Sequence, residues 1–181
     1  MKKTWVFLVI GFILGFSLIA FGAGMMFGDN IQGYYYHFNP PVYNPPHEET
    51  SINSTQLLSL LNEKRKQKDL KPIKENTMLD YVAYLRAKTI FDTQEYTHEA
   101  TRSGLTYSIV ADKLGYFYRF IGENLAIGYT NEEQIITDWE KSKKHADIMF
   151  SNNYAEAGTY TLEGNLYGDS KNATVLILGK Q

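Results

Sequence analysis

Three residues in the middle of the chain have side chains that could bind a metal ion or move a proton: His98, Glu123 and His145. Two neutral imidazoles and a carboxylate can hold zinc tetrahedrally and leave one position for water, as metal-activated hydrolysis requires. The alternative is that Glu123 only orients a histidine by a hydrogen bond and that no metal is held. Because the three residues are widely spaced in the sequence, only the fold can bring them together.

Two other catalytic signatures begin near these residues, and neither is complete. His98 is followed by Glu99, as in the zinc-protease signature His-Glu-x-x-His, but the last position is Arg102. Ser142 precedes His145 by three positions, but no Gly-x-Ser-x-Gly turn surrounds it. The sequence therefore favours a hydrogen bond from Ser142 to a helix-end carbonyl or to His145 over a role as nucleophile.

Composition excludes several functional classes. The chain has 181 residues and a formal net charge of -2, so no overall positive field argues for binding to nucleic acid. It contains no cysteine, which excludes disulfide bonds and thiolate chemistry. The first fifty or so residues differ in composition from the rest, which leaves about 130 residues for one ordinary domain.

Residues 1–28 have the composition of a signal-anchor that spans a membrane. No charged residue occurs from Trp5 to Phe27, and as a helix this segment would be roughly 34 Å long, enough to cross the apolar core of a bilayer. Lysines before it and Asp29 after it favour an N-terminus inside the cell and a C-terminal domain outside the cytoplasm. The alternative is a cleaved signal peptide and a secreted domain, but the apolar run is long for one.

Residues 29–53 are expected to be an extracytoplasmic linker. They show neither helical nor strand periodicity, and they contain four of the five prolines of the chain: Pro40, Pro41, Pro45 and Pro46. Because proline lacks an N–H and favours extended backbone, this segment is expected to be a semi-rigid spacer. The run Tyr34 to Tyr36 either rests at lipid headgroups or belongs to a disordered tether.

Residues 54–181 form the predicted domain, which begins with helices. Their caps and apolar periodicity predict four of them. These are a first helix capped by Ser54 or Thr55 and ended by Pro72, a second capped by Asn76, a third over Thr106–Leu114, and a fourth from the capping box at Thr130–Glu133 to a point at or just before His145. The inward face of the second helix is traced by Leu79, Val82, Ala83, Arg86 and Ile90.

After Tyr154 the pattern changes to short runs rich in Thr, Tyr and Val, separated by glycines. Such runs are typical of strands and hairpins. The run Val175–Leu178 has no polar alternation, which predicts a central strand covered on both faces. Helices followed by hairpins indicate an α+β fold, with helices packed on a small antiparallel sheet.

Aromatic side chains are frequent between residues 107 and 129. They are Tyr107, Tyr116, Phe117, Tyr118, Phe120 and Tyr129. If exposed, they could form an apolar wall that binds lipid or glycan. Aromatic residues in such numbers more often belong to a core or cover a sheet, and we expect that role here.

Four short blocks occur in an order that resembles one known family. They are Tyr96-Thr97-His98 with Gly104, Gly122 to Ala126, Trp139-x-x-Ser142-x-x-His145, and Asn153-Tyr154 leading to Gly158. With Asn62, Arg65 and the run Leu70 to Ile73, they resemble the bacterial branch of the CAP superfamily. This superfamily, also called the SCP-like domain, includes cysteine-rich secretory proteins, antigen 5 and plant pathogenesis-related proteins. The resemblance covers residues 55–179.

The resemblance implies an α-β-α sandwich with a cavity lined by His98, Glu123, Ser142 and His145. In that family the two histidines can hold a divalent cation such as zinc, which here would be His98 and His145. Ser142 stands where many eukaryotic members have a second acid, a substitution typical of the bacterial branch, which also lacks the eukaryotic cysteines. Two departures from that branch, at positions 146 and 148, concern the outer rim of the site and not the fold.

The sequence therefore predicts an exported, membrane-anchored CAP-like domain that serves as a binding or interaction module at a bacterial cell surface. Its ligand is a protein, a lipid or a glycan. The alternative is a metal-assisted hydrolase of a peptide or of cell-envelope material in the same cavity, with His98, Glu123 and His145 as catalytic candidates. A third reading is a structural envelope protein with a vestigial site, which the absent second acid supports.

Overall fold

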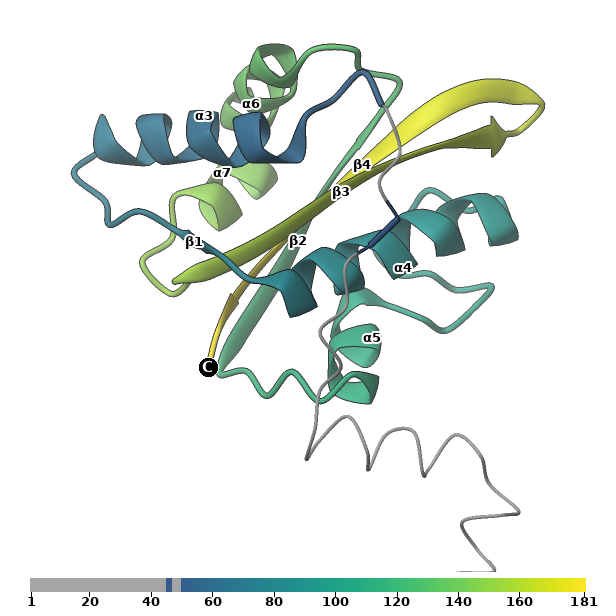
Figure 1. Cartoon of the computed structure of the whole chain (residues 1–181), viewed down its shortest axis with the longest axis horizontal. Coiled ribbons are helices and arrows are strands. Elements are labelled where there is room, and N and C mark those ends of the chain that lie inside the picture. The colour runs from purple at the N-terminus through teal and green to yellow at the C-terminus, as the bar shows by residue number, and fades with distance from the viewer. Residues whose placement is uncertain (1–44, 47–49) are drawn as a thin grey trace, which may run out of the picture. The chain divides into compact units, whose positions relative to one another are not determined.

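The computed structural model describes residues 45–46 and 50–181 of the chain (Figure 1). The predicted membrane span at 1–28 and most of the predicted linker at 29–53 lie outside the described residues. Within the described ranges, no helix has both the length and the apolar character needed to cross a bilayer.

Helices come first and the longest strands last, as the sequence predicted. The elements are α3 (Ser54–Lys66), β1 (Lys74–Glu75), α4 (Thr77–Thr93), α5 (Tyr107–Lys113), β2 (Phe120–Ile127), α6 (Glu132–Lys141), α7 (Lys143–Met149), β3 (Glu156–Leu166) and β4 (Asp169–Lys180). The α+β class is therefore confirmed for the described part of the chain.

The caps of two helices differ by one residue from the prediction. Helix α3 is capped by Asn53, whose side chain accepts a hydrogen bond from the Gln56 N–H, and not by Ser54 or Thr55. Helix α6 is capped by Asn131 and not by Thr130. In each case an adjacent asparagine takes the position, in keeping with its strong preference for N-caps. The predicted cap of α4, Asn76, is confirmed, and Thr106, the first residue of the predicted third helix, is the N-cap of α5.

The predicted fourth helix is two helices in the structure, so its predicted end at or just before His145 was wrong. Helix α6 ends at Lys141, and Ser142 has an extended backbone with φ -84° and ψ 113° before α7 begins. Serine favours helix boundaries over helix interiors, which is consistent with a break at this position. His145 consequently lies within the short helix α7 and not at the end of a longer one.

The four strands form one sheet in the order β1-β3-β4-β2. Strand β4 pairs antiparallel with both β3 and β2, which confirms Val175–Leu178 as part of a central strand. The sheet is mixed and not purely antiparallel, because the two residues of β1 pair parallel to β3. Strand β2 was not predicted, and its sequence includes the run Gly122 to Ala126.

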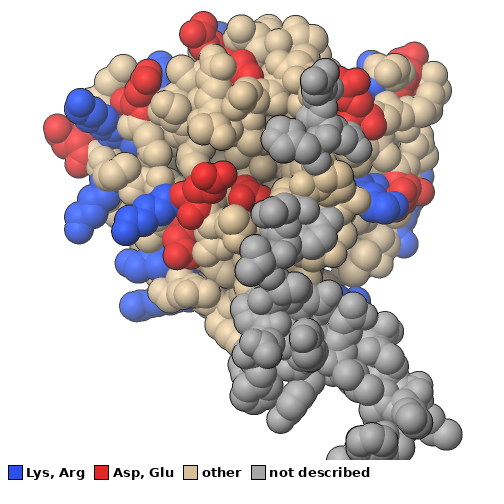
Figure 2. Space-filling model, in the orientation of Figure 1, with Lys and Arg blue, Asp and Glu red and all other residues tan. Residues whose placement is uncertain are grey.

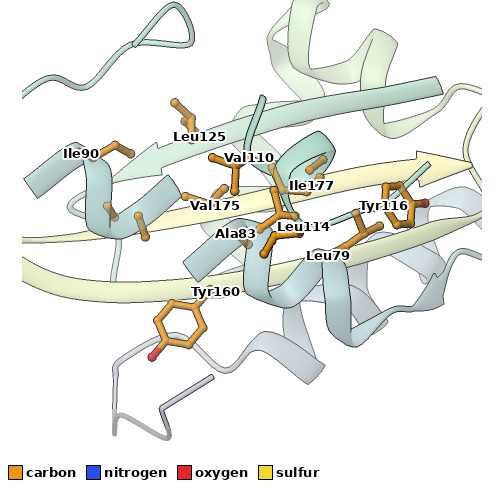
Figure 3. Close-up of a cluster of buried hydrophobic side chains, with 14 of the residues drawn as sticks. Leu79, Ala83, Ile90, Val110, Leu114, Tyr116, Leu125, Tyr160, Val175 and Ile177 are labelled. Atoms are coloured by element: carbon orange, nitrogen blue, oxygen red, sulfur yellow. The ribbon is translucent and has the colours of Figure 1, made fainter. Parts of the chain in front are cut away.

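Helices cover both faces of the sheet (Figure 1), so residues 172–179 of the central strand β4 are buried. Val175 and Ile177 of β4 lie in the cluster with α4 and α5 (Figure 3). Leu176 and Leu178 lie in the second cluster, with α3, α6 and α7. Burial of both faces explains the absence of polar alternation in this strand. The described residues thus form an α-β-α sandwich.

The start of α4 lies directly against β3. A Cβ atom at Gly158 would come within 2.0 Å of the backbone of Leu79 and Asp80, so no larger residue fits there without moving the helix. The buried Asp80 carboxylate accepts a hydrogen bond of 2.8 Å from the Thr159 N–H. Burial raises the pKa of Asp80 to about 7, and the nearby Glu75 adds to the increase.

On the surface, acidic and basic side chains lie beside one another on the face shown in Figure 2. Lys64 of α3 and Lys68, which follows this helix, both contact the Glu140 carboxylate of α6, at 2.8 and 3.1 Å. The hydrogen bond from Lys64 is the main cause of a pKa for Glu140 below its ordinary value. Exposed pairs of this kind contribute little to stability.

Candidate functional site

The structure brings His98, Glu123 and His145 together at the edge of the sheet formed by β2. The Nδ1 atom of His98 lies 2.9 Å from Oε1 of Glu123, and the ring centroids of His98 and His145 are 6.3 Å apart. Glu123 projects from β2, His98 from the loop after α4, and His145 from α7. We call these three residues the histidine cluster.

Glu123 is fixed by a buried arginine that the sequence analysis assigned to the inward face of a core helix and not to the site. Arg86 of α4 donates from Nε to Oε2 of Glu123 at 2.8 Å, and its Nη2 lies 3.5 Å from Oε1. Exposure is 1% for Arg86 and 2% for Glu123. An arginine among apolar residues on a helix face requires a buried acceptor, which is the signal that could have identified Arg86.

Arg86 also fixes the loop that carries His98. Its guanidinium donates to the carbonyl of Thr97 at 3.1 Å and to the carbonyl of Leu105 at 3.0 Å. These two carbonyls lie on either side of His98 in sequence. One guanidinium therefore positions both partners of the contact between His98 and Glu123.

A second carboxylate holds the same loop from the other side. Glu95, which is 9% exposed, accepts hydrogen bonds from the N–H groups of Thr101 and Arg102 at 2.9 and 2.8 Å. With the Thr101 hydroxyl as the largest cause, these hydrogen bonds hold the pKa of Glu95 below its ordinary value. The loop around His98 is thus fixed at both ends.

The contact with Glu123 determines how His98 presents its ring. An ionised carboxylate paired with arginine can only accept hydrogen bonds, so Nδ1 of His98 carries the proton. In the neutral imidazole, Nε2 is then the acceptor with a free lone pair. The side chain of His98 is 47% exposed while that of Glu123 is fully buried. The site therefore combines a buried charged base with an accessible imidazole.

His145 lies half-buried on α7, next to Trp139 of α6, with ring centroids 6.2 Å apart. Burial lowers the pKa of His145 from its ordinary value, and the neighbouring His98 and Lys144 lower it further. His145 is consequently neutral at pH 7, and its ring can accept a hydrogen bond or act as a base.

Neighbouring residues of strand β2 contact opposite sides of the site. Glu123 faces Arg86, whereas the next residue, Asn124, donates from its side chain to the carbonyl of His145 at 3.2 Å. The indole N–H of Trp139 donates to the carbonyl of Leu125 at 3.0 Å. The Gly-Glu-Asn-Leu run therefore orients α6 and α7 as well as the carboxylate.

Ser142 is placed differently from the other residues predicted to line the cavity. It forms the junction of α6 and α7, where its side chain makes no capping hydrogen bond. Within residues 50–181, no hydrogen bond joins its hydroxyl to His98, Glu123 or His145. Its contribution in the structure is made by the backbone, because its carbonyl accepts from the Ala146 N–H at 2.8 Å.

The side chains present do not fit a catalytic zinc site. Such sites use three protein ligands and a water, but both oxygens of Glu123 are already bound to Arg86 and His98. Ser142, the remaining residue that was predicted to line the cavity, has no carboxylate, which leaves two imidazoles. Over the described residues, no group of three or more His, Cys, Asp or Glu side chains is arranged to hold a metal ion.

Most of the aromatic residues between 107 and 129 belong to the core, as predicted. Tyr116 is 1% exposed, and Tyr107, Tyr118 and Tyr129 pack against the two buried clusters. Phe117 is the exception at 61% exposure. The alternative role, an apolar wall that binds lipid or glycan, is therefore not supported for this group as a whole.

Comparison with known proteins places this geometry in a family. The family model described as "Cysteine-rich secretory protein family" (CAP) matches residues 58–174. The chain is 23% identical over 118 residues to "Uncharacterized protein YkwD" of Bacillus subtilis (strain 168), a match that covers 65% of this chain and 46% of that protein. The chain thus spans less than half of the length of this curated relative.

Three solved structures have the same fold. An outer surface protein from Borrelia burgdorferi aligns with a TM-score of 0.63 and 24% identity, covering 70% of this chain and 91% of that one. An extracellular protein containing a SCP domain from Bacillus anthracis aligns with a TM-score of 0.61 and 17% identity, covering 77% of this chain and 46% of that one. A cysteine-rich secretory protein from Staphylococcus aureus aligns with a TM-score of 0.55 and 23% identity, covering 82% of this chain and 49% of that one.

Proposed function

The chain belongs to the cysteine-rich secretory protein (CAP) family, and from that premise we propose that it is an exported binding module at a bacterial cell surface. The histidine cluster is its binding site, and residues 1–28 anchor it to the membrane. The printed descriptions of the similar structures, an outer surface protein and an extracellular protein, support the location. The apolar N-terminal sequence supports the anchor. Mass measurement of the N-terminus in a membrane fraction would show whether the anchor is retained.

The observation that carries this proposal is the hydrogen bond between the half-exposed His98 and the buried Glu123, which Arg86 holds in place. A buried ion pair is costly to desolvate, and a purely structural core gains little from one. Here the pair fixes an accessible imidazole whose Nε2 can accept a hydrogen bond. A second neutral imidazole lies 6.3 Å away, so a ligand that offers two donors, such as a glycan or a peptide, matches the cluster.

The test is co-sedimentation of the full-length chain, kept in detergent because of the proposed anchor, with isolated bacterial cell walls. We expect retention that is at least tenfold weaker in His98→Ala and in His145→Ala. His37→Ala, which changes a histidine of the predicted linker, is the matched control and should bind as the parent does. Equal retention of all four proteins would show that the cluster is not the binding site.

A second function, hydrolysis of a peptide or of cell-envelope material, is favoured by one specific feature. A histidine oriented by a buried carboxylate is the arrangement of a general base, and His98 has it. The same samples can be assayed for soluble fragments released from the cell walls and for zinc content. Release that is lost in both cluster variants would establish an enzyme, whereas retention without release would leave the binding module.

A further inference from the structure

Away from the histidine cluster, the chain's own proline-rich segment is bound by a side chain of the domain. The hydroxyl of Tyr160 in β3 donates a hydrogen bond of 2.7 Å to the carbonyl of Pro46, which lies 114 positions earlier in the sequence. In Figure 1, Pro45–Pro46 is the short blue segment near α4. Figure 3 shows the Tyr160 hydroxyl pointing away from the other labelled side chains of its cluster.

Tyr160 is the end of a row of three tyrosine rings. The Tyr84 and Tyr160 rings meet edge to face, with centroids 5.1 Å apart. Tyr81 and Tyr84 are stacked at 6.0 Å, because residues three apart lie on the same side of a helix. Helix α4 and strand β3 thus place three rings in sequence, and we call them the tyrosine row.

The chemistry of this row matches that of a proline-rich segment. Proline has no N–H, so a Pro-Pro sequence can be recognised only through its carbonyl oxygens and the faces of its rings. Tyrosine supplies a hydroxyl donor and an aromatic face. Protein modules that bind proline-rich segments use aromatic-lined grooves because the polyproline II conformation loses little entropy on binding.

The same segment is fixed at a second point a few residues later. Ile52 is 3% exposed in the buried cluster on the α3 face of the sheet, whereas Tyr160 belongs to the cluster on the α4 face. Ser51 accepts a hydrogen bond from the Asn172 side chain at 3.0 Å. The chain is therefore attached to the α4 face of the sheet at Pro46 and to the α3 face at Ile52.

We infer that the tyrosine row is a binding surface for a proline-rich segment and that its occupant is Pro45–Pro46 of this chain. Residues 45–46 are consequently held against the domain, so the chain does not pivot at the first residue of α3.

The absence of cysteine from the chain permits a direct test by distance measurement between two introduced cysteines. Spin labels at Val42→Cys and Lys113→Cys in the full-length chain in detergent should give a narrow distance distribution. Tyr160→Phe removes one hydroxyl and should raise the broad, released fraction about fivefold. Tyr84→Ala and Pro45→Ser with Pro46→Ser should raise it further.

Tyr167→Phe is the matched control, because Tyr167 is an exposed tyrosine outside the row, and it should leave the distribution unchanged. A broad distribution in the parent would overturn the inference, as would an unchanged distribution in Tyr160→Phe. Circular dichroism identifies any variant that fails to fold. If Tyr84→Ala is one of these, Tyr160→Phe decides the question, since it alters a single oxygen atom.

Discussion

Two arginines are almost completely buried, one on each face of the sheet, and they are held in different ways. Arg65 of α3 is 0% exposed and donates only to backbone carbonyls, those of Lys71, Met149 and Ser151, at 2.6 to 3.0 Å. Burial lowers the pKa of Arg65 from its ordinary value. Arg86 of α4 also donates to two carbonyls, but it has in addition the carboxylate of Glu123.

The difference separates a structural arginine from one that serves a site. Arg65 joins the end of α3 to the end of α7, and within residues 50–181 its hydrogen-bond partners are all backbone carbonyls. Arg86 is linked through Glu123 to His98, whose side chain is 47% exposed. A buried arginine that is hydrogen-bonded through a carboxylate to an accessible histidine ring can act on a ligand. A buried arginine that is hydrogen-bonded only to backbone carbonyls can only stabilise the fold. Four changes would break or sharpen this comparison.

The largest effect is expected from Arg86→Met, which leaves the Glu123 carboxylate buried without its ion-pair partner. Removal of one member of a buried pair costs about 3–5 kcal/mol, so the free energy of unfolding should fall by that amount. Urea unfolding followed by circular dichroism measures it. The combination of Arg86→Met with Glu123→Leu should recover part of the loss. If the losses simply add, the two side chains do not act as a pair.

A third buried ionisable residue, Asp80, tests how much burial alone costs when the residue has no ion-pair partner. Its pKa is about 7 in the folded chain against an ordinary 3.8, so the folded state binds more protons than the unfolded state between these values. Stability should therefore fall as the pH rises from about 4 to about 7 and stay constant above that. The fall should be about 4 kcal/mol, because each unit between the two pKa values corresponds to about 1.4 kcal/mol.

Asp80→Asn keeps the oxygen that accepts from the Thr159 N–H and removes the charge. The fall in stability that Asp80 causes between pH 4 and 7 should be absent from this variant, whose stability should exceed that of the parent at pH 8. Thermal unfolding across this range measures both. A parent whose stability is flat from pH 4 to 7 would mean that Asp80 is ionised at no cost where it lies.

Arg65→Met should have a smaller effect on the free energy of unfolding. Three carbonyls lose the hydrogen bonds that Arg65 donates, but no charge is left unpaired. The expected loss is about 1–3 kcal/mol. Binding by the histidine cluster should stay unchanged in the folded variant, which separates it from Arg86→Met. Loss of binding in Arg65→Met at a temperature where it is folded would show that α7 transmits a change to His145, and the two arginines would then not be distinct.

The sequence predicted the helices and the central strand because their signals are local. Asn76 and Thr106 cap helices by bonding to backbone two or three residues away, and Val175 to Leu178 are apolar without interruption. Strand β2 was missed because Gly122, Glu123 and Asn124 are residues that strands rarely contain. They are buried here because each polar side chain has a partner on its own face of the sheet.

The roles of the site residues could be predicted only in part. His98, Glu123 and His145 stood out by residue type and by resemblance to a family, and the structure brings them together. Arg86 did not stand out, because its role in the site depends on a carboxylate 37 positions away and on two carbonyls of a loop. The break at Ser142, which sets the position of His145, depends on a single backbone conformation that no periodicity indicates.

The smallest effect concerns His145, whose pKa lies below the ordinary 6.5 through burial and through the nearby His98. Because the folded state binds fewer protons, this residue contributes stability above pH 6.5 that is lost as the pH falls below it. Titration of the ring protons by NMR should show a pKa of His145 that rises in His98→Ala, because the electrostatic effect by which His98 lowers that pKa is removed. It should not reach the ordinary value, because burial remains. Arg65→Met should leave the titration unchanged, and an equal shift in both variants would remove the distinction between the two faces of the sheet.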